Sequence, residues 1–544
     1  MRALLCGLAY LGLGAGTLRS AMPTAGEARA AAERLLAKAG NNTGPGCAAS
    51  VLFKGVVVFD GAAGTSDGSR PLNSVTPVYL ASVSKQFTAA AVYRLAQQGR
   101  IELNERIQTR IPELGRSAIT VQQLLNHTSG LRDYGALQEI QGSQAAMETA
   151  EVIRLLSAQR ANNFEPGTDY EYSNSDYVLL AALVERASGL PFDEFVKREF
   201  FDPLGMNRSW FQSHRTPRYE PARGFAVRNG KLAPHSSIPR TNGDGGMYST
   251  VSDLLRWMRA VERAGGSQSA LKQIQRRARL KSGESIPHAS GLFWGQYKGR
   301  PTISHNGAVA GFQADVVHFP KQRLSVVCLC NRGDVDAASL SREIAGVYLG
   351  TVGERDLKGA RSGRRPISAD LAGIWRSKQG FVLTTKIDGT SLVASLAGDM
   401  HSMFLGRNPK EFSTESETPR LLLRRKGKDA VDHLWEGDRP TSFERIRPAS
   451  ITPALDRYVG RFVNSELGVA WDLVLEKEAL VITTAAGWRI PLTRSVDDHF
   501  EVGPWQLEFE QSGTGVSGFR LHRERVWNLR FAREADPVLN RQTP

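Results

Sequence analysis

The sequence predicts an α+β domain, an antiparallel sheet with helices, followed by two small all-β barrel domains. Strand-like and helix-like segments alternate over roughly the first 355 residues, whereas short β-like runs between turns fill the remainder. A charged, glycine-containing stretch at residues 353–366 separates the two parts. The chain of 544 residues is also too long for one ordinary core, so we expect several domains.

The first domain, residues 31–352, is expected to begin and end with strands. The segment 46–64 has the pattern of a β-hairpin that turns at Lys54 and Gly55. Amphipathic helices follow, among them residues 84–98 and 177–187. Further strands are expected at residues 302–307, 311–319 and 323–331. We therefore expect the first and last strands to share one sheet.

Residues 353–366 lack hydrophobic periodicity and are interpreted as a linker. Beyond it, aromatic residues recur at offsets of 87 or 88 residues: Trp375 and Phe462, Phe412 and Phe500, and Phe443 and Phe531. This faint repeat predicts two similar antiparallel barrels, residues 367–447 and 448–535. Their polar residues form no catalytic cluster, so we expect them to be structural or to restrict access to the first domain.

The N-terminus has the features of a secretory signal. Arg2 precedes an apolar, small-residue run from Ala3 to Gly16, which is too short and too rich in glycine to span a bilayer. Cleavage after Ala30, giving a signal of residues 1–30, and an earlier cut near Gly16 both fit. No later stretch predicts a transmembrane helix. We therefore expect a periplasmic or secreted protein.

The formal net charge of +14 fits either an anionic partner or an exported protein with a basic surface. Zinc-finger, RNA-binding and Walker patterns do not occur, so we expect no nucleic-acid partner, metal or cofactor. Three cysteines remain after the signal. Cys328 and Cys330 would share one face of a strand, and either could pair with Cys47, although small buried hydrophobic residues are the alternative.

The stretch Ser82-Val83-Ser84-Lys85 carries the first chemical signal. A serine hydroxyl is a poor nucleophile unless a base lies beside it. If Ser82 opens a helix, Lys85 follows one turn later on the same face, where its amine can reach the serine oxygen. The helix N-terminus favours developing negative charge, and a buried lysine can accept a proton. The alternative is a serine that only caps a helix.

Two further elements strengthen this signal. Tyr172-Ser173-Asn174 is expected in a loop that runs into a helix, where the phenol could relay a proton and the amide could hold a substrate. His305-Asn306-Gly307 is expected at the end of a strand. There Gly307 would let a substrate backbone approach, and the Ala308 N–H could point at an oxyanion.

In this order and spacing, the three elements resemble the penicillin-binding-protein and serine β-lactamase superfamily, whose pattern is S-x-x-K, a second polar triad and K-T-G. The Tyr-x-Asn form is similar to its branch of class C β-lactamases, D,D-peptidases and esterases. Supporting stretches lie at residues 124–134, 191–206 and 243–257, and the resemblance covers about residues 40 to 350. It implies a β-lactamase-like fold for the first domain.

The resemblance also implies a role for each residue. Ser82 would be the acylated nucleophile, Lys85 its hydrogen-bonded activator, and Tyr172 the shared general base and acid. Asn174 would bind substrate. The backbone N–H groups of Ser82 and Ala308 would form the oxyanion hole.

The third element departs from K-T-G, because His305 stands where the pattern has its lysine. A neutral imidazole offers less charge to a substrate carboxylate, so β-lactam hydrolysis and D-Ala-D-Ala carboxypeptidase activity are less strongly implied. His-x-Gly instead resembles the D-aminopeptidases and some esterases of this branch. The D-aminopeptidases also carry two β-barrel domains behind the catalytic one.

One feature of the D-aminopeptidases is missing. Their third domain is expected to send a long loop with a carboxylate into the active site, to bind the substrate's free amine. The corresponding hairpin here, residues 499–509, turns on little more than Gly503-Pro504, which cannot reach far. Asp497 and Asp498 lie nearby but are expected in a solvated turn.

Two other motifs compete with this interpretation. Residues 64–68, GTSDG, match a nucleophile elbow, but the two prolines that follow do not allow the required helix. His127 could be catalytic, but a structural hydrogen bond is the favoured interpretation.

The sequence therefore predicts an exported serine hydrolase that forms an acyl-enzyme on Ser82. The favoured substrates are D-amino-acid peptides or amides, with small esters next and β-lactams third. The alternatives are a carboxylesterase or β-lactamase of the same superfamily, or a catalytically silent protein that binds penicillin or cell-wall peptide. The sequence does not indicate an oligomeric state.

Overall fold

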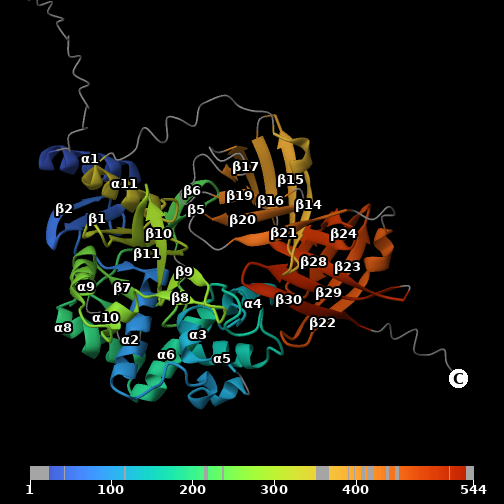
Figure 1. Ribbon diagram of the computed structural model, residues 1–544, viewed down its shortest axis with the longest axis horizontal. Helices are drawn as coiled ribbons and strands as arrows, with labels where there is room; N and C mark the ends of the chain where they lie inside the picture. The colour runs from blue at the N-terminus through green and yellow to red at the C-terminus, as the bar shows by residue number, and fades with distance from the viewer. Residues whose placement is uncertain are drawn as a thin grey trace, which may run out of the picture.

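The structure is a computed structural model. It describes residues 24–534 except 42, 116–117, 213–218, 236–237, 351–366, 390, 397–398, 406–410, 414–420, 428, 436–439, 448–452 and 514. Most of the predicted signal and the whole of the predicted linker, residues 353–366, lie outside the described residues. Figure 1 shows the first domain on one side and two β domains on the other.

An eight-stranded antiparallel sheet forms the centre of the first domain, in the order β2-β1-β13-β12-β11-β10-β9-β8. The N-terminal hairpin lies at one edge and turns at Lys54 and Gly55, which both have positive φ. Strand β1 pairs with β13, so the first and last strands share a sheet, as predicted. The strands are β1 (Cys47–Phe53), β2 (Val56–Ala63), β8 (Arg277–Arg279), β9 (Ser285–Ala289), β10 (Leu292–Tyr297), β11 (Arg300–Val309), β12 (Phe312–Phe319) and β13 (Leu324–Cys330).

Helix α2 (Lys85–Gln97) lies at the centre of the helical layer. The sequence predicted an amphipathic helix, but the nine consecutive residues Lys85–Tyr93 are all buried. Helices α6, α7 and α10 pack against α2 and cover its faces. The other helices are α1 (Ala25–Ala39), α3 (Val121–Leu125), α4 (Tyr134–Ile140), α5 (Thr149–Ser157), α6 (Asn174–Ser188), α7 (Phe192–Val196), α8 (Asp202–Leu204), α9 (Val251–Arg263), α10 (Ala270–Gln273) and α11 (Ala337–Leu349).

Helix α1 bears on the predicted signal cleavage. Thr24 and Glu27 form a capping box at its start, and Ala28 and Ala32 are buried. The helix packs against β2 and α11. A cut after Ala30 would divide this packed helix, so the earlier cleavage near Gly16 agrees better with the fold.

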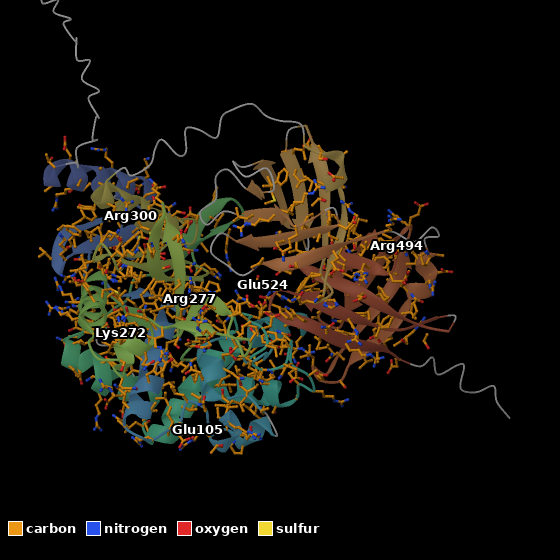
Figure 2. The ribbon with its side chains drawn as sticks, viewed as in Figure 1. Glu105, Lys272, Arg277, Arg300, Arg494 and Glu524 are labelled. Carbon is orange, nitrogen blue, oxygen red and sulfur yellow. A yellow bond between two sulfur atoms is a disulfide. The ribbon has the colours of Figure 1, made fainter. Side chains whose placement is uncertain are left out.

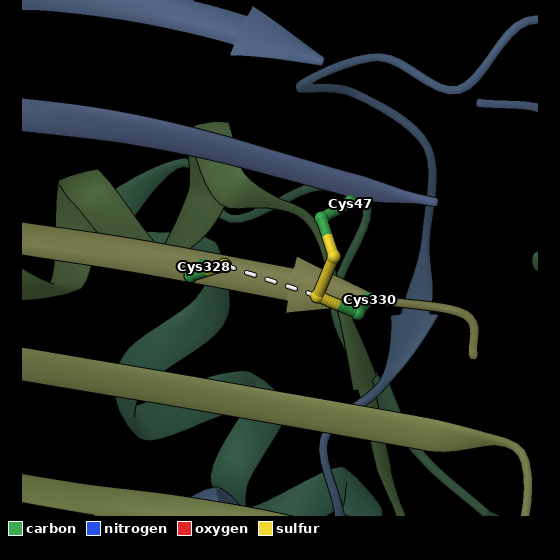
Figure 3. A group of neighbouring side chains, drawn as sticks. All are labelled: Cys47, Cys328 and Cys330. Atoms are coloured by element: carbon green, nitrogen blue, oxygen red, sulfur yellow. Dashed lines mark hydrogen bonds between the residues drawn. A yellow bond between two sulfur atoms is a disulfide. The ribbon is translucent and has the colours of Figure 1, made fainter. Parts of the chain in front are cut away.

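The three cysteines meet where β1 and β13 pair. Cys47 and Cys330 form a disulfide, and Cys328 is a buried free thiol with its Sγ 3.9 Å from that of Cys330 (Figure 3). Of the two pairings left open by the sequence, the register selects this one, because Cys47 lies directly opposite Cys330.

The first β domain is a closed eight-stranded barrel, and the C-terminal β domain is a nine-stranded antiparallel sheet. The edge strands of the latter, β25 and β26, are separated only by Leu492, so the sheet curls into a nearly closed barrel. The aromatic residues of the predicted repeat are buried in the two cores. The barrel strands are β14 (Gly373–Ser377), β15 (Val382–Asp388), β16 (Ser391–Leu396), β17 (Asp399–Leu405), β18 (Glu411–Ser413), β19 (Leu421–Arg425), β20 (Ala430–Trp435) and β21 (Thr441–Ile446).

The strands of the C-terminal β domain are β22 (Gly460–Asn464), β23 (Val469–Glu476), β24 (Ala479–Thr484), β25 (Arg489–Pro491), β26 (Thr493–Val496), β27 (His499–Val502), β28 (Trp505–Ser512), β29 (Gly515–Arg523) and β30 (Val526–Arg533). Small sheets of the first domain comprise β3 (Val78–Tyr79), β4 (Trp210–Phe211), β5 (Phe225–Arg228), β6 (Lys231–Pro234) and β7 (Met247–Ser249). Among the described residues, no helix has the length and apolarity needed to cross a membrane.

The hairpin between β29 and β30 docks the C-terminal β domain onto the first domain. The carbonyl oxygen of Arg525 accepts hydrogen bonds from the Asp133 N–H at 3.2 Å and from the Asn163 side chain at 3.0 Å. Arg132 is buried between the domains and pairs with Glu466 at 3.0 Å. Glu524 at the tip of the hairpin lies at this junction (Figure 2). The domain contact therefore involves the same loop that precedes α4.

Candidate active site

Ser82 lies in a short 3-10 turn, Ala81–Ser84, between β3 and α2. Ala81 has φ of 46°, in the left-handed region that residues other than glycine rarely adopt. A Cβ on Gly307 would lie 2.1 Å from the Leu80 carbonyl oxygen and 2.9 Å from the Ser82 amide nitrogen. Strand β11 therefore presses directly on the turn and can hold its strained conformation.

Lys85 is the first residue of α2 and its side chain is fully buried. Its ammonium donates hydrogen bonds to the Ser82 hydroxyl at 3.2 Å, to the Asn174 amide oxygen at 2.8 Å and to the Asp244 carbonyl oxygen at 2.6 Å. The three donors of an ammonium are thus all used, which fixes the nitrogen beside the serine. The structure brings the first and second sequence elements together at this atom.

Tyr172 lies against the same ammonium. The Lys85 nitrogen is 4.9 Å from the centroid of its ring, and the His127 ring centroid is 4.5 Å from it. The phenol oxygen is buried and has no hydrogen-bond partner among the described residues. This buried hydroxyl belongs to a ring that lies against the ammonium bonded to Ser82, so it is available to take part in proton transfer there.

The second element runs into a helix as predicted, but the helix α6 begins earlier than expected, with Asn174 as its first residue. Its backbone N–H donates to the Asp133 carboxylate at 2.6 Å, and Asp133 also caps α4. Because its amide oxygen accepts from Lys85, the amide NH₂ group remains for a substrate carbonyl.

His305 and Gly307 lie inside β11 rather than at the end of a strand, because the strand continues to Val309. The His305 Nδ1 donates to the Asn306 carbonyl oxygen at 2.5 Å, and its Nε2 is buried without a partner among the described residues. Burial, with the charge of Lys85 adding to it, lowers the pKa of His305 to about 3. The imidazole is therefore neutral at ordinary pH.

Gly307 was expected to admit a substrate backbone. The backbone that approaches it is the chain's own turn at Leu80–Val83, so the glycine is required by packing within the protein. Ala308, the next residue, lines the same cavity as Ser82, which places the two predicted oxyanion-hole residues on one cavity wall.

His127 has a structural contact, in line with the favoured interpretation. It is fully buried, and its Nδ1 lies 3.0 Å from the Asp176 carboxylate and 3.2 Å from the Ser173 amide nitrogen. Burial lowers the pKa of His127 well below its usual value and raises that of Asp176 well above its own. The pair ties the loop after α3 to the first turn of α6, which orients the second element.

A cavity of about 260 Å³ opens beside the nucleophile. Its walls include Ser82, Asn174, Ala308, Tyr134 and Asp244. Lys85 and His305 are not among its lining residues, because they lie buried behind this wall. A small acyl group could therefore sit between the serine, the amide and the strand β11.

Asp244 is a cavity residue to which the sequence interpretation gave no role. Its carboxylate accepts hydrogen bonds from the Tyr134 hydroxyl at 2.9 Å and the Thr241 hydroxyl at 2.9 Å. A Cβ on Gly243 would lie 2.2 Å from the Tyr177 carbonyl oxygen, so the surrounding glycines let this loop lie against α6. The run Gly243-Asp244-Gly245-Gly246 was the available signal, since so many glycines around one carboxylate indicate a closely packed loop.

The short hairpin that corresponds to the D-aminopeptidase loop lies between two strands of the C-terminal β domain. The hairpin at Gly503-Pro504 belongs to β27 and β28, and Asp498 beside it accepts a hydrogen bond from Tyr458 within its own domain. The hairpin between β29 and β30 brings a side chain to Tyr172, because its Arg525 guanidinium carbon lies 4.9 Å from the Tyr172 ring centroid. No sequence motif indicated this contact.

Comparisons with known proteins show what this chain is similar to. A family model described as beta-lactamase matches residues 31–349. A D-aminopeptidase of Brucella anthropi is 24% identical over 508 residues, which covers 87% of this chain and 92% of that protein. A D-aminopeptidase of Gluconobacter oxydans (strain 621H) is 25% identical over 512 residues, covering 88% and 94%. Penicillin-binding protein 4* of Bacillus subtilis (strain 168) is 29% identical over 282 residues, covering 48% and 62%.

Solved structures share the fold. The octameric penicillin-binding protein homologue from Pyrococcus abyssi superposes with a TM-score of 0.54 at 21% identity, covering 78% of this chain and all of that one. A D-stereospecific amidohydrolase from Streptomyces sp. gives a TM-score of 0.50 at 22% identity, covering 60% of this chain and 99% of that one.

Proposed function

The chain belongs to the beta-lactamase family of serine hydrolases, and from this premise we propose that it is a D-aminopeptidase, which releases an N-terminal D-residue from a peptide or amide. The proposal is supported by two relatives of that name, which match most of this chain and most of their own length. The family model covers residues 31–349 only, whereas the matches to these two relatives extend into the C-terminal β domains.

The proposed reaction uses the groups gathered around Lys85. The Ser82 oxygen attacks the carbonyl carbon, and its proton passes to the Lys85 and Tyr172 pair. The amide N–H groups of Ser82 and Ala308 stabilise the oxyanion. Tyr172 then gives a proton to the leaving amine as the C–N bond breaks, and water hydrolyses the resulting ester with the proton transfers reversed.

The carboxylate of Asp244 is the observation that carries the proposal. It is the acidic side chain on the wall of the cavity that contains Ser82, and it is only 6% exposed. An N-terminal residue held at Ser82 brings a positively charged α-amine into that cavity. A carboxylate that is already aligned by two hydroxyl groups can bind this amine.

The third element supports the same choice of substrate. A neutral His305 supplies no positive charge for a substrate carboxylate, unlike a lysine at this position. A peptide with a free amine on its acyl side does not need such a charge. The site is therefore better suited to an aminopeptidase than to a carboxypeptidase or a β-lactamase.

A substrate panel tests the proposal. We expect the wild type to hydrolyse p-nitroanilides of D-amino acids faster than those of L-amino acids, p-nitrophenyl esters or nitrocefin, and Ser82→Ala to abolish the activity. N-acetylation of the D-anilide should lower kcat/KM by at least about tenfold, because it removes the charge that Asp244 binds. Preferred turnover of nitrocefin or of acetylated substrate would exclude the aminopeptidase.

Asp244→Asn provides the matched control, since it keeps the shape and removes the charge. We expect it to lower kcat/KM for the free-amine substrate and to leave the acetylated one nearly unchanged. Burial raises the pKa of Asp244, so protonation should also raise KM for the free-amine substrate as the pH falls. An equal loss on both substrates would show that Asp244 has a structural role only.

We also propose that the protein is exported and acts on short peptides, including cell-wall peptides that begin with a D-residue. The Cys47–Cys330 disulfide supports export, because such bonds persist in oxidising compartments. Cell fractionation and N-terminal sequencing of the mature protein test this, with a mature N-terminus before α1 expected. An intact Met1 in the cytoplasm would contradict it.

A further inference from the structure

The C-terminal β domain places a cation against the side chain proposed as general base. The guanidinium carbon of Arg525 and the ammonium nitrogen of Lys85 each lie 4.9 Å from the centroid of the Tyr172 ring. Arg525 comes from the turn between β29 and β30, more than 400 residues along the chain from Lys85. Tyr172 therefore has two cations beside it, and each comes from a different domain.

The backbone of the turn fixes this arrangement. Arg525 has φ of 68°, and its carbonyl oxygen is bonded to Asp133 and Asn163 of the first domain. The Trp527 N–H donates to the Asn163 side chain at 2.8 Å, so one asparagine binds both sides of the turn. Because the backbone makes the docking contacts, the Arg525 side chain is free to extend over the tyrosine.

Arg525 and Lys85 are the main positive charges near Tyr172, because the neighbouring histidines are neutral at ordinary pH. Burial is the chief cause that lowers the pKa of the three nearby histidines, to about 3 for His305 and well below the usual value for His127 and His288. Burial, with Glu524 adding to it, raises the pKa of Glu171 to about 8. The charged or titratable groups that act on Tyr172 or Arg525 are Lys85, His127, Asp133, Glu171, His305 and Glu524. Behind them, Asp169 acts on Glu171, Asp176 bonds His127, and His288 lies against His127.

We propose that Arg525 supplies the second positive charge at Tyr172 that a lysine in the third sequence element would otherwise provide, and that the C-terminal β domain thereby completes the active site. His305 occupies the position of that lysine and is neutral. A positive charge against the ring stabilises the negative charge that develops on the phenol as it takes the serine proton. Arg525 is thus a positioning residue that acts through Tyr172, and the inference rests on the proposed acyl-enzyme mechanism.

The pH dependence of acylation tests this inference without any assumption about the peptide substrate. The second-order rate of labelling by a fluorophosphonate probe would be measured against pH for the wild type and for Arg525→Gln. We expect the acidic limb of the profile to move to higher pH in Arg525→Gln, because one of the two cations beside Tyr172 is removed. Arg525→Lys keeps the charge and should restore part of the shift.

Two neighbouring variants separate charge from docking. Glu524→Gln removes the negative charge that pairs with Arg525 at 3.1 Å, so it should move the acidic limb to lower pH, and by a smaller amount because Glu524 is exposed. Arg523→Gln removes an arginine of the same hairpin that bonds Glu139 instead, and its profile should follow the wild type. Thermal unfolding of each variant confirms that it folds.

The outcomes for the inference and for the mechanism differ. One outcome would overturn the inference alone: the wild type is labelled, and the pH profile of Arg525→Gln is lower in rate but does not move along the pH axis. A shift of the same sign in Glu524→Gln and Arg525→Gln would overturn it too. A folded wild type that is never labelled would overturn both the inference and the acyl-enzyme mechanism.

Discussion

The ammonium nitrogen of Lys85 lies 3.2 Å from the hydroxyl oxygen of Ser82. The same nitrogen is bonded to the second element through Asn174 and to the glycine-rich loop through the Asp244 carbonyl oxygen. One buried nitrogen thus connects three segments that are distant in the sequence. Substitution of Lys85 should therefore affect both the chemistry and the packing around it.

Lys85→Met should lower kcat/KM by about 10²–10⁴-fold, the range for loss of a proton-transfer group. Methionine matches the length of the stem but leaves the three acceptors without a donor, so some loss of stability is also expected. Activity assays with thermal unfolding of the same samples measure the two effects. Activity within a factor of two of the wild type would contradict the role of Lys85.

Gly307→Ala tests whether the close packing of β11 holds the turn that contains Ser82. The added Cβ would lie 2.1 Å from the Leu80 carbonyl oxygen, so the strand or the turn must move. We expect a loss of about 1–3 kcal/mol in the free energy of unfolding and a large loss of activity, because Ser82 moves with the turn. Gly299→Ala is the control. Its added Cβ would have open space around it, but Gly299 has a positive φ, which alanine rarely adopts. This variant should therefore lose stability without a comparable loss of activity.

Arg132→Ala tests the attachment of the C-terminal β domain. Arg132 is buried, donates to Glu466 and Gln159, and also contacts the Trp527 carbonyl oxygen. Its removal leaves a partly buried carboxylate without its partner, which we expect to cost about 3–5 kcal/mol. Limited proteolysis between the domains should become faster. Unchanged proteolysis and stability would show that the domains are held by other contacts.

Acid should weaken the junction between the two β domains. Glu508 of the C-terminal β domain lies 3.2 Å from Arg376 of the first barrel. The contact with His522, together with His499 and Arg376, lowers the pKa of Glu508 from 4.5 to about 2. Burial lowers the pKa of His499 from 6.5 to about 4. Both groups bind protons more readily in the unfolded chain, so acid favours unfolding.

The free energy of unfolding should therefore fall as the pH drops from 6.5 towards 2, with His499 acting between 6.5 and 4 and Glu508 between 4.5 and 2. Glu508→Gln should be less stable than the wild type at pH 7, and the difference should disappear near pH 2. Denaturant unfolding at several pH values measures both curves. A difference that does not change with pH would contradict the role of this carboxylate.

Local sequence patterns predicted much of the fold and of the catalytic centre. The hairpin at Lys54-Gly55, the last three strands of the first domain and the body of helix α6 follow from residue spacing and turn chemistry, whereas β8, β9 and β10 were not predicted. The predicted helix after Ser82 was misread as amphipathic, because burial on every side depends on what packs around it. A local pattern shows the period of an element but does not show how many neighbours cover it.

The sequence alone identified Ser82, Lys85 and the two further elements as the candidate site, because each is a short run whose spacing already limits its geometry. The tertiary structure decided which charges surround those groups. Asp244 reaches the cavity, and Arg525 reaches Tyr172, only because a glycine-rich loop packs on α6 and a hairpin of another domain docks beside Asp133. Electrostatic contacts depend on distance in space, and residues hundreds of positions apart have no spacing that could reveal them.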